Sequence, residues 1–369
     1  MTLITIPREI LLKPLQAVSG IIERRHTLAI LSNVLIAREA ASLRFLATDV
    51  EIEISASITA EPTSDERTVT VGARKLLDIL RALPDKAEIS LVAQEKRLIV
   101  KSGKSRYTLQ TLPTEDFPRM AAPESGSVSL SIPQALLKSL FLQVAYAMAQ
   151  QDIRYYLNGL LLMGDNGVLR VVATDGHRLA LAEREVAPKD IGKQEVILPR
   201  KTVLELARLL DDSDDPVAIE LTGNQARFSF GSTVLVSKLI DGKFPDYNRV
   251  IPKNHPKNLV LNRLLLLHAL QRAAILTNDK FRGVRWILGE NTLRISSNNT
   301  EQEEAQEELD IAYTGEALDI GFNVSYLLDV LNNLETDEVE CALGDGNSSA
   351  LFTLKDRADF KYVVMPMRI

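Results

Sequence analysis

The sequence predicts an α+β chain of three repeated domains, each with two helices packed against antiparallel sheets. One block, Leu46–Asp49, recurs as Val172–Asp175 and as Ile295–Asn298, at spacings of 126 and 123 residues. A second block keeps the same step, since its Arg74 corresponds to Arg200 and Asn323. A period this long is that of a domain and not of a solenoid unit.

Turn-forming residues mark the junctions between the repeats. They gather near 121–127 and again near 252–258, where Pro, Gly, Ser and Asn are frequent. No long low-complexity linker separates the repeats, so we expect the domains to pack end to end. The predicted domains are residues 1–122, 127–252 and 253–369.

Each repeat contains two windows with helical periodicity. Pro133 stands at the expected first turn of one window, where proline is favoured, and Pro199 stands just before the helix expected at 200–210. Pro14 lies inside the first window and predicts a kink or a late start there. The predicted helical windows are 7–19, 72–82, 133–147, 199–210, 262–275 and 323–334.

Short alternating stretches between the helices predict half-buried antiparallel strands. Examples are Leu43–Leu46, Glu51–Ala56 and Gly167–Val172, in which apolar residues recur at every second position. The 46% hydrophobic content is enough for a full core in every repeat.

Composition restricts the class of protein. A single Cys341 excludes an internal disulfide and favours a reducing, cytoplasmic location. Four scattered His residues and one Cys offer no zinc cluster. No apolar run approaches the roughly 18 residues of a membrane span and no leader is recognisable, so no membrane span is expected.

Charge is sorted by element type although the chain as a whole carries −6. The six helical windows contain eleven Lys and Arg but only four Asp and Glu, a net charge of +7, which leaves −13 for everything else. If the helices share one surface, that surface is basic and suits nucleic acid. A general preference of Lys and Arg for helices would give the same count.

Several long motifs, in order along the whole chain, resemble those of the bacterial sliding clamps, the beta subunits of DNA polymerase III. They begin with Leu11–Leu15 and end with Val364–Ile369. Between these lie Asp152–Gly159, Ala173–Leu179, Phe244–Tyr247 and Lys280–Arg285.

The resemblance implies the DNA-clamp fold, in which two chains close head to tail into a ring lined by helices and walled by sheets. It implies a non-catalytic processivity factor that needs no cofactor and encircles duplex DNA without reading its sequence. The expected partners are the replicative polymerase, the clamp loader, and other polymerases and repair proteins with clamp-binding motifs.

Matching positions also imply contacts to DNA, which attraction to phosphate would supply while permitting sliding. Packing before a strand is an alternative for the two tyrosines. The predicted DNA-binding residues are Arg25, Arg74, Gln151, Tyr155, Tyr156, Arg200 and Lys201.

A second set of positions matches the family's peptide pocket, a cleft between the second and third domains. Methionine suits varied partners because its side chain is flexible and polarizable; the alternative is that Met-Pro-Met merely ends a buried strand. The predicted pocket residues are Arg154, Leu157, Thr174, Gly176, His177, Arg178, Leu179, Pro245, Arg249, Val250, Ser349, Val363, Met365, Pro366, Met367 and Arg368.

The third set concerns the seam of the ring. Basic residues of the first repeat and an acidic run in the third have the opposite signs that a head-to-tail contact needs, although acidic runs are usually solvated surface. The predicted interface residues are Lys75, Lys104, Arg106, Tyr107, Leu109, Ile275, Leu276, Glu301, Glu303 and Glu304.

Asp175 and His177 permit a rival interpretation as a metal-dependent phosphodiesterase or nuclease. The other repeats do not keep this pair: Asp49 is followed two residues on by Glu51, and Asn298 replaces the aspartate in the third. Neither a convergent catalytic set nor a phosphate-binding loop accompanies the pair, so we expect no enzyme.

Overall fold

The computed structural model describes residues 1–23, 28–121, 128–186 and 193–368. The chain forms two compact units. Unit 1 comprises Met1–Lys138 and Lys201–Leu239, and unit 2 comprises Ser139–Arg200 and Ile240–Ile369. In each unit the described strands build one four-stranded and one eight-stranded antiparallel sheet.

The four-stranded sheet of unit 1 has the order β1-β6-β7-β8 and its eight-stranded sheet the order β5-β2-β3-β4-β16-β15-β14-β9. The strands are β1 Thr2–Pro7, β2 Asn33–Glu39, β3 Ser42–Thr48, β4 Ile52–Thr59, β5 Arg67–Gly72, β6 Glu88–Gln94, β7 Arg97–Ser102, β8 Ser105–Gln110, β9 Val128–Pro133, β14 Pro216–Leu221, β15 Gln225–Phe230 and β16 Thr233–Lys238.

Unit 2 repeats this plan with the orders β20-β19-β18-β21 and β13-β10-β11-β12-β24-β23-β22-β17. The strands are β10 Gly159–Asp165, β11 Val168–Thr174, β12 Arg178–Glu185, β13 Gln194–Pro199, β17 Lys257–Asn262, β18 Gly283–Gly289, β19 Thr292–Asn298, β20 Glu304–Asp310, β21 Leu318–Asn323, β22 Glu338–Leu343, β23 Ala350–Leu354 and β24 Arg357–Val364.

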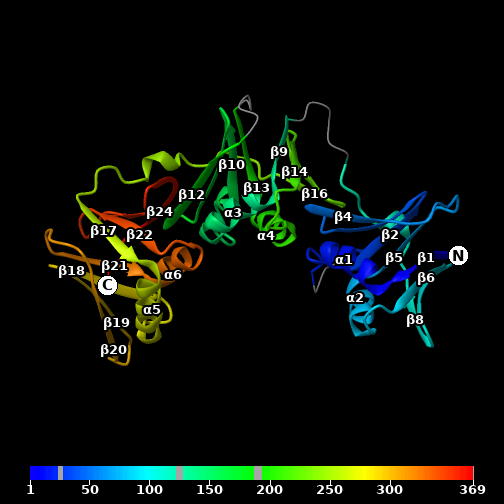
Figure 1. Ribbon diagram of the computed structural model, residues 1–369, viewed down its shortest axis with the longest axis horizontal. Coiled ribbons are helices and arrows are strands. Elements are labelled where there is room, and N and C mark those ends of the chain that lie inside the picture. Colours follow the sequence, from blue (N-terminus) through cyan, green and yellow to red (C-terminus); the bar gives the residue numbers. More distant parts are fainter. Residues whose placement is uncertain (24–27, 122–127, 187–192, 369) are drawn as a thin grey trace. The chain divides into compact units, whose positions relative to one another are not determined.

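Each predicted helical window contains an α-helix. The helix α1 packs against α2 in unit 1, and α5 packs against α6 in unit 2 (Figure 1). The predicted late start at Pro14 is wrong, because α1 begins at Arg8 and holds Pro14 buried within it. The helices are α1 Arg8–Ser19, α2 Ala73–Ala82, α3 Gln134–Val144, α4 Arg200–Leu209, α5 Arg263–Ala273 and α6 Val324–Asn332.

The repeats are joined through their sheets. In unit 1, β4 of the first repeat pairs with β16 of the second; in unit 2, β12 of the second pairs with β24 of the third. The strands of the middle repeat are therefore divided between the two units, which is why the compact units cut across the sequence period.

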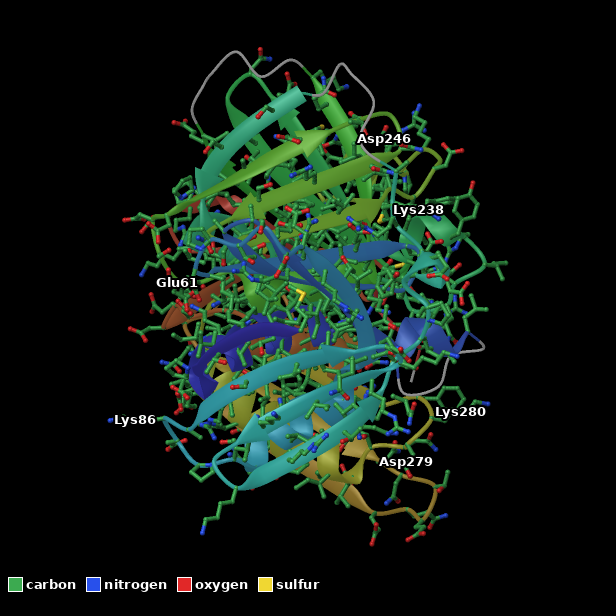
Figure 2. All side chains as sticks on the ribbon, turned by 90° about the vertical axis from the view of Figure 1, so that its right-hand side faces the viewer. Glu61, Lys86, Lys238, Asp246, Asp279 and Lys280 are labelled. Atoms are coloured by element: carbon green, nitrogen blue, oxygen red, sulfur yellow. The ribbon has the colours of Figure 1, made fainter. Side chains whose placement is uncertain are left out.

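Aromatic side chains fill the core of unit 2. Trp286 stands edge-on to Phe322 at 5.4 Å and to Phe352 at 6.3 Å, distances between ring centroids that are typical of stabilising aromatic pairs. Charged side chains such as Lys86 and Lys280 instead extend away from the ribbon (Figure 2). Among the described residues, no helix is long and apolar enough to cross a membrane.

Candidate functional site

Unit 2 contains a pocket of about 460 Å³, called the unit 2 pocket below. Its lining comes from segments as far apart in sequence as Arg154 and Met365. Thirteen of the sixteen predicted pocket residues line it: Arg154, Leu157, Thr174, Gly176, His177, Arg178, Leu179, Pro245, Arg249, Val250, Ser349, Val363 and Met365.

Three further lining residues were not predicted for this pocket: Tyr156, Asp246 and Tyr247. Asp246 and Tyr247 belong to the motif Phe244–Tyr247, whose aromatic side chains favour burial against an apolar surface. Tyr156 is also one of the predicted DNA-binding residues.

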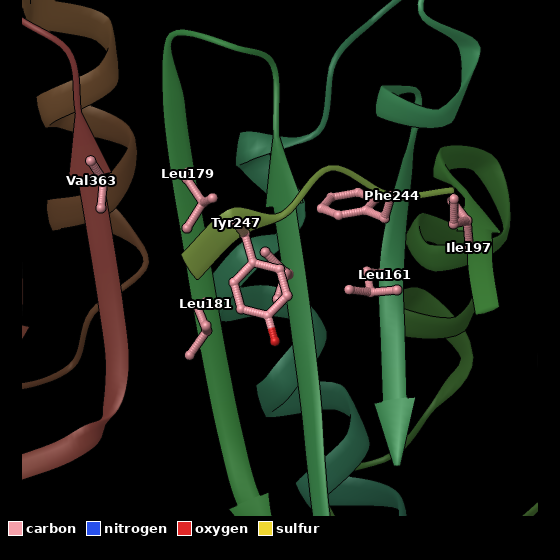
Figure 3. Packing of buried hydrophobic residues seen from close by; sticks show 8 residues of the cluster. Leu161, Leu179, Leu181, Ile197, Phe244, Tyr247 and Val363 are labelled. Carbon is pink, nitrogen blue, oxygen red and sulfur yellow. The ribbon is translucent and has the colours of Figure 1, made fainter. Parts of the chain in front are cut away.

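The floor of the pocket is a buried apolar cluster on one face of the eight-stranded sheet. Leu179 and Leu181 of β12 and Val363 of β24 belong to it, and Phe244 and Tyr247 of the segment after β16 lie across the strands (Figure 3). The Tyr247 hydroxyl accepts a hydrogen bond from Arg170 at 3.2 Å, so its polar end is satisfied while its ring packs on the cluster.

One wall of the pocket is the turn that links β11 to β12. The Asp175 carboxylate accepts hydrogen bonds from the backbone N–H groups of His177 and Arg178, at 2.9 and 3.0 Å. The Thr174 hydroxyl donates to the Arg178 carbonyl at 2.6 Å. Gly176 adopts φ +90°, a left-handed conformation that favours glycine, and leaves His177 exposed beside the pocket.

Arg154 borders this turn. It donates to both carboxylate oxygens of Asp152 at 3.0 and 2.8 Å, and to the Asp175 carbonyl at 3.3 Å. The Arg154 hydrogen bonds lower the pKa of Asp152 to about 2, so its carboxylate is ionised at all physiological pH values. A Cβ atom on Gly176 would lie 3.0 Å from the Arg154 guanidinium, so glycine also permits this close approach.

The C-terminal segment supplies a second wall, next to this turn. The backbone N–H of Met365 donates to the His177 carbonyl at 2.9 Å, and half of the Met365 side chain is exposed. The remaining predicted residues Pro366, Met367 and Arg368 follow it but are not part of this lining. Met367 and Arg368 line a separate pocket of unit 2 with residues that include Asn278 and Phe281.

Asp175 and His177 do not form a hydrolytic site. Both oxygens of Asp175 are used in the turn, because Oδ1 accepts the two backbone hydrogen bonds and Oδ2 pairs with Arg178 at 3.1 Å. The described part of the chain contains no group of three or more His, Cys, Asp and Glu suited to a metal ion.

The predicted DNA-binding residues of unit 2 lie on and near the segment before β10. Gln151 is exposed and has a left-handed backbone with φ +56°, and 57% of Tyr155 is exposed. Arg200 at the start of α4 donates to the carbonyls of Ala145 and Met148 at 3.3 and 3.2 Å. Burial and the nearby Arg178 lower the pKa of Arg200.

In unit 1, Arg74 of α2 is exposed, and its guanidinium donates to the Ile22 carbonyl at 3.4 Å. Lys201 is engaged within the protein, since its ammonium donates to Asp49, to Glu23 at 3.2 Å and to the Ile21 carbonyl at 3.1 Å. Arg25 lies outside the described residues.

The predicted interface residues lie on or beside the edge strands of the two four-stranded sheets. In unit 1, β8 is an edge strand; Lys104, in the turn before it, and Arg106 are exposed, while Tyr107 and Leu109 are half-buried. Lys75 is exposed on α2.

The matching edge of unit 2 is β20. Glu301, Glu303 and Glu304 are exposed at and before its start. Ile275 lies in the 3-10 turn that follows α5, and 76% of it is exposed, whereas Leu276 is half-buried.

Three family models together match nearly the entire chain. They describe the N-terminal, central and C-terminal domains of the DNA polymerase III beta subunit and match residues 2–121, 131–246 and 248–368.

Individual relatives agree with these models. The beta sliding clamp of Pseudomonas aeruginosa is 49% identical over 365 residues, which cover 99% of each chain. The crystal structure of the DNA polymerase III subunit beta from the same organism covers 100% of both chains with a TM-score of 0.95 and 48% identity. A second structure from that organism, a sliding clamp bound to griselimycin, has a TM-score of 0.94 and 49% identity and covers 99% of each chain.

Proposed function

The chain belongs to the family of DNA polymerase III beta subunits, the bacterial sliding clamps, and on this premise we propose that its partner proteins dock in the unit 2 pocket. Its function is that of a sliding clamp in DNA replication, a processivity factor without catalytic activity of its own. The rival nuclease interpretation has no support in the relatives or in the geometry of Asp175.

The docking proposal rests on one observation. Residues distant in sequence line the unit 2 pocket, which has an apolar floor and polar walls. The cluster beneath it supplies a surface for hydrophobic anchors, and Arg154, His177 and Arg249 supply donors at the rim. This combination of an apolar floor and few polar groups is typical of ligand sites. The proposed occupants are short segments of the replicative polymerase, the clamp loader and repair proteins.

Griselimycin provides a defined probe, because relatives from two organisms have been crystallised with it. We propose that it also binds this chain, in the unit 2 pocket. Its binding measures the pocket without requiring a reconstituted polymerase.

DNA binding is proposed to be electrostatic and independent of sequence. The six α-helices of the described residues carry eleven Lys and Arg and four Asp and Glu, a net charge of +7. Such a helical surface would attract phosphates and permit sliding. Of the proposed contacts that the structure describes, Arg74, Gln151 and Tyr155 are the most accessible, whereas Lys201 would first have to leave its carboxylate partners.

A head-to-tail homodimer is proposed to close the ring around the duplex. The exposed edges of β8 and β20 carry opposite charges, with Arg106 on one and Glu304 on the other, and edge strands offer unpaired backbone groups. A heterologous contact of this kind makes a ring when its rotation closes. The proposed location is the cytoplasm.

The docking proposal is tested by placing a charge in the pocket. Val250 lines the pocket with 53% of its surface exposed, and Val260 on β17 is 46% exposed outside it. We expect Val250→Glu to weaken griselimycin binding and polymerase stimulation by about 100-fold or more, because it buries an unpaired carboxylate against apolar surface. Val260→Glu, the matched control, should leave both unchanged.

Deletion of Met365–Ile369 provides a second variant that removes one wall of the pocket. We expect the truncated chain to be retained on nicked circular DNA and to be lost after linearisation, as the intact chain is, but to stimulate no polymerase. Full stimulation by either pocket variant would contradict the docking proposal.

A further inference from the structure

The turn that forms one wall of the unit 2 pocket occurs a second time in unit 1. In Thr48–Ile52 the Thr48 hydroxyl donates to the Ile52 carbonyl at 2.8 Å, and Asp49 accepts from the backbone N–H groups of Glu51 and Ile52 at 3.0 and 2.8 Å. Thr174–Arg178 has the same three hydrogen bonds. The two turns are therefore equivalent, and Arg178 corresponds to Ile52.

The two turns differ in how each is tied to a helix. In unit 1 the helix provides the cation: Lys201 of α4 reaches the turn residue Asp49. In unit 2 the turn provides the cation: Arg178 reaches Asp329 of α6 at 2.5 Å. Ile52, in the place of Arg178, is buried in the core. The ion pair between Arg178 and Asp329 is therefore specific to unit 2, because the equivalent turn of unit 1 has Ile52 in the place of Arg178.

The Arg178 guanidinium has carboxylate, carbonyl and aromatic partners. Its side chain is only 9% exposed, Nε pairs with Asp175 at 3.1 Å, and Nη2 donates to the Tyr146 carbonyl at 2.5 Å. Its guanidinium carbon lies 4.4 Å from the centre of the Tyr326 ring, within the range of a cation–π interaction. Tyr326 and Asp329 are both on α6. This helix therefore contacts Arg178 through the Tyr326 ring and through the Asp329 carboxylate.

The positions of both walls of the pocket depend on these contacts between Arg178 and α6. The turn carries Gly176 and His177, and the His177 carbonyl accepts the backbone hydrogen bond from Met365. A shift of Arg178 would therefore move the turn and, through Met365, the adjoining wall. Asp329 itself is not part of the pocket lining.

We propose that Asp329 is a positioning residue of the unit 2 pocket: acting through Arg178, it fixes the turn that carries Gly176 and His177 and so determines how long a ligand is held. This inference rests on the proposed docking function. Removing the Asp329 carboxylate, which is 42% exposed, takes one of two anionic partners from a guanidinium that is only 9% exposed. Affinity differences between related complexes appear chiefly in the dissociation rate.

The test compares Asp329→Asn with Asp329→Glu and uses griselimycin as the probe. We expect Asp329→Asn to raise the dissociation rate about tenfold with little change in the association rate, since Asp175 still pairs with Arg178. Asp329→Glu, which restores the charge, should return the rate to within about threefold of the original. Surface plasmon resonance measures both rates.

Asp78→Asn is the matched control, because Asp78 holds the same place in α2, six residues after the N-cap, and is exposed in unit 1. We expect it to leave griselimycin kinetics unchanged. Thermal unfolding and retention on nicked circular DNA report whether Asp329→Asn disturbs the protein as a whole, and we expect retention to persist.

Two results would overturn the inference while leaving the docking proposal intact. One is an Asp329→Asn protein with the dissociation rate of the unaltered chain. The other is a loss of binding that Asp329→Glu does not restore and that follows the thermal stability. Failure of the unaltered chain to bind griselimycin would instead overturn the docking proposal, and the inference with it.

Discussion

The adjacent residues Tyr155 and Tyr156 have different surroundings. Tyr155 is 57% exposed and lies near Gly242, while Tyr156 packs on the apolar cluster and lines the unit 2 pocket. Their rings meet edge to face at 5.8 Å. Sequence could not separate the two, because it is the short 3-10 turn Tyr155–Leu157 that directs one ring outward and the other inward. Tyr155 and Tyr156 both stay predicted DNA contacts, and Tyr156 in addition lines the unit 2 pocket.

Cys341 gives a test at the scale of one residue. It is the chain's only cysteine and is buried in β22, where burial raises the pKa of its thiol. Because the thiolate is the reactive form, we expect labelling by a disulfide reagent at pH 8 to be at least about 100-fold slower in the native protein than in urea. Absorbance of the released thiol measures the rate, and equal rates in the two states would contradict the burial.

The helices could be located from sequence because their apolar faces repeat with helical periodicity. The predicted window 133–147 contains α3, which ends at Val144 and is followed by the 3-10 turn Ala145–Ala147. The positions of Met367 and Arg368 could not be predicted in this way. The backbone N–H of Met367 donates to the Gly321 carbonyl at 2.9 Å, a tertiary contact that no local pattern encodes.

The N-terminus of α5 gives a test at the scale of an element. The Asn262 side chain accepts a hydrogen bond from the Leu265 N–H at 3.0 Å and so caps the helix. We expect Asn262→Ala to lower the free energy of unfolding of unit 2 by about 1 kcal/mol, since a helix donor loses its partner. Trp286, the chain's only tryptophan, is buried in unit 2 and reports its urea unfolding by fluorescence.

Asn258→Ala is the control for this change, because Asn258 is an exposed asparagine on β17, close to the cap in sequence. Its unfolding midpoint should match that of the unaltered chain. Equal midpoints for all three proteins would show that the cap contributes nothing measurable.

At the scale of the whole molecule, the sequence period identified the three repeats but not how their strands are shared. The pairing of β4 with β16 and of β12 with β24 joins neighbouring repeats into continuous sheets. Strand pairing between repeats depends on register and tertiary contact, which a single sequence does not display. The observed helices carry the net charge of +7 that was predicted for the helical windows, because this charge depends only on which residues are helical.

Ring closure supplies the test at this scale. Arg106 is exposed on the edge strand β8, and we expect Arg106→Glu to convert the dimer into monomers, because like charges would then face the acidic run that includes Glu301 and Glu304. Light scattering should give a mass near the 40.9 kDa of one chain. Arg97→Glu, on the neighbouring strand β7 of the same sheet, makes the same charge change away from the edge and should remain dimeric. A dimeric Arg106→Glu protein would rule out β8 as the seam, and monomers from both variants would trace the effect to net charge.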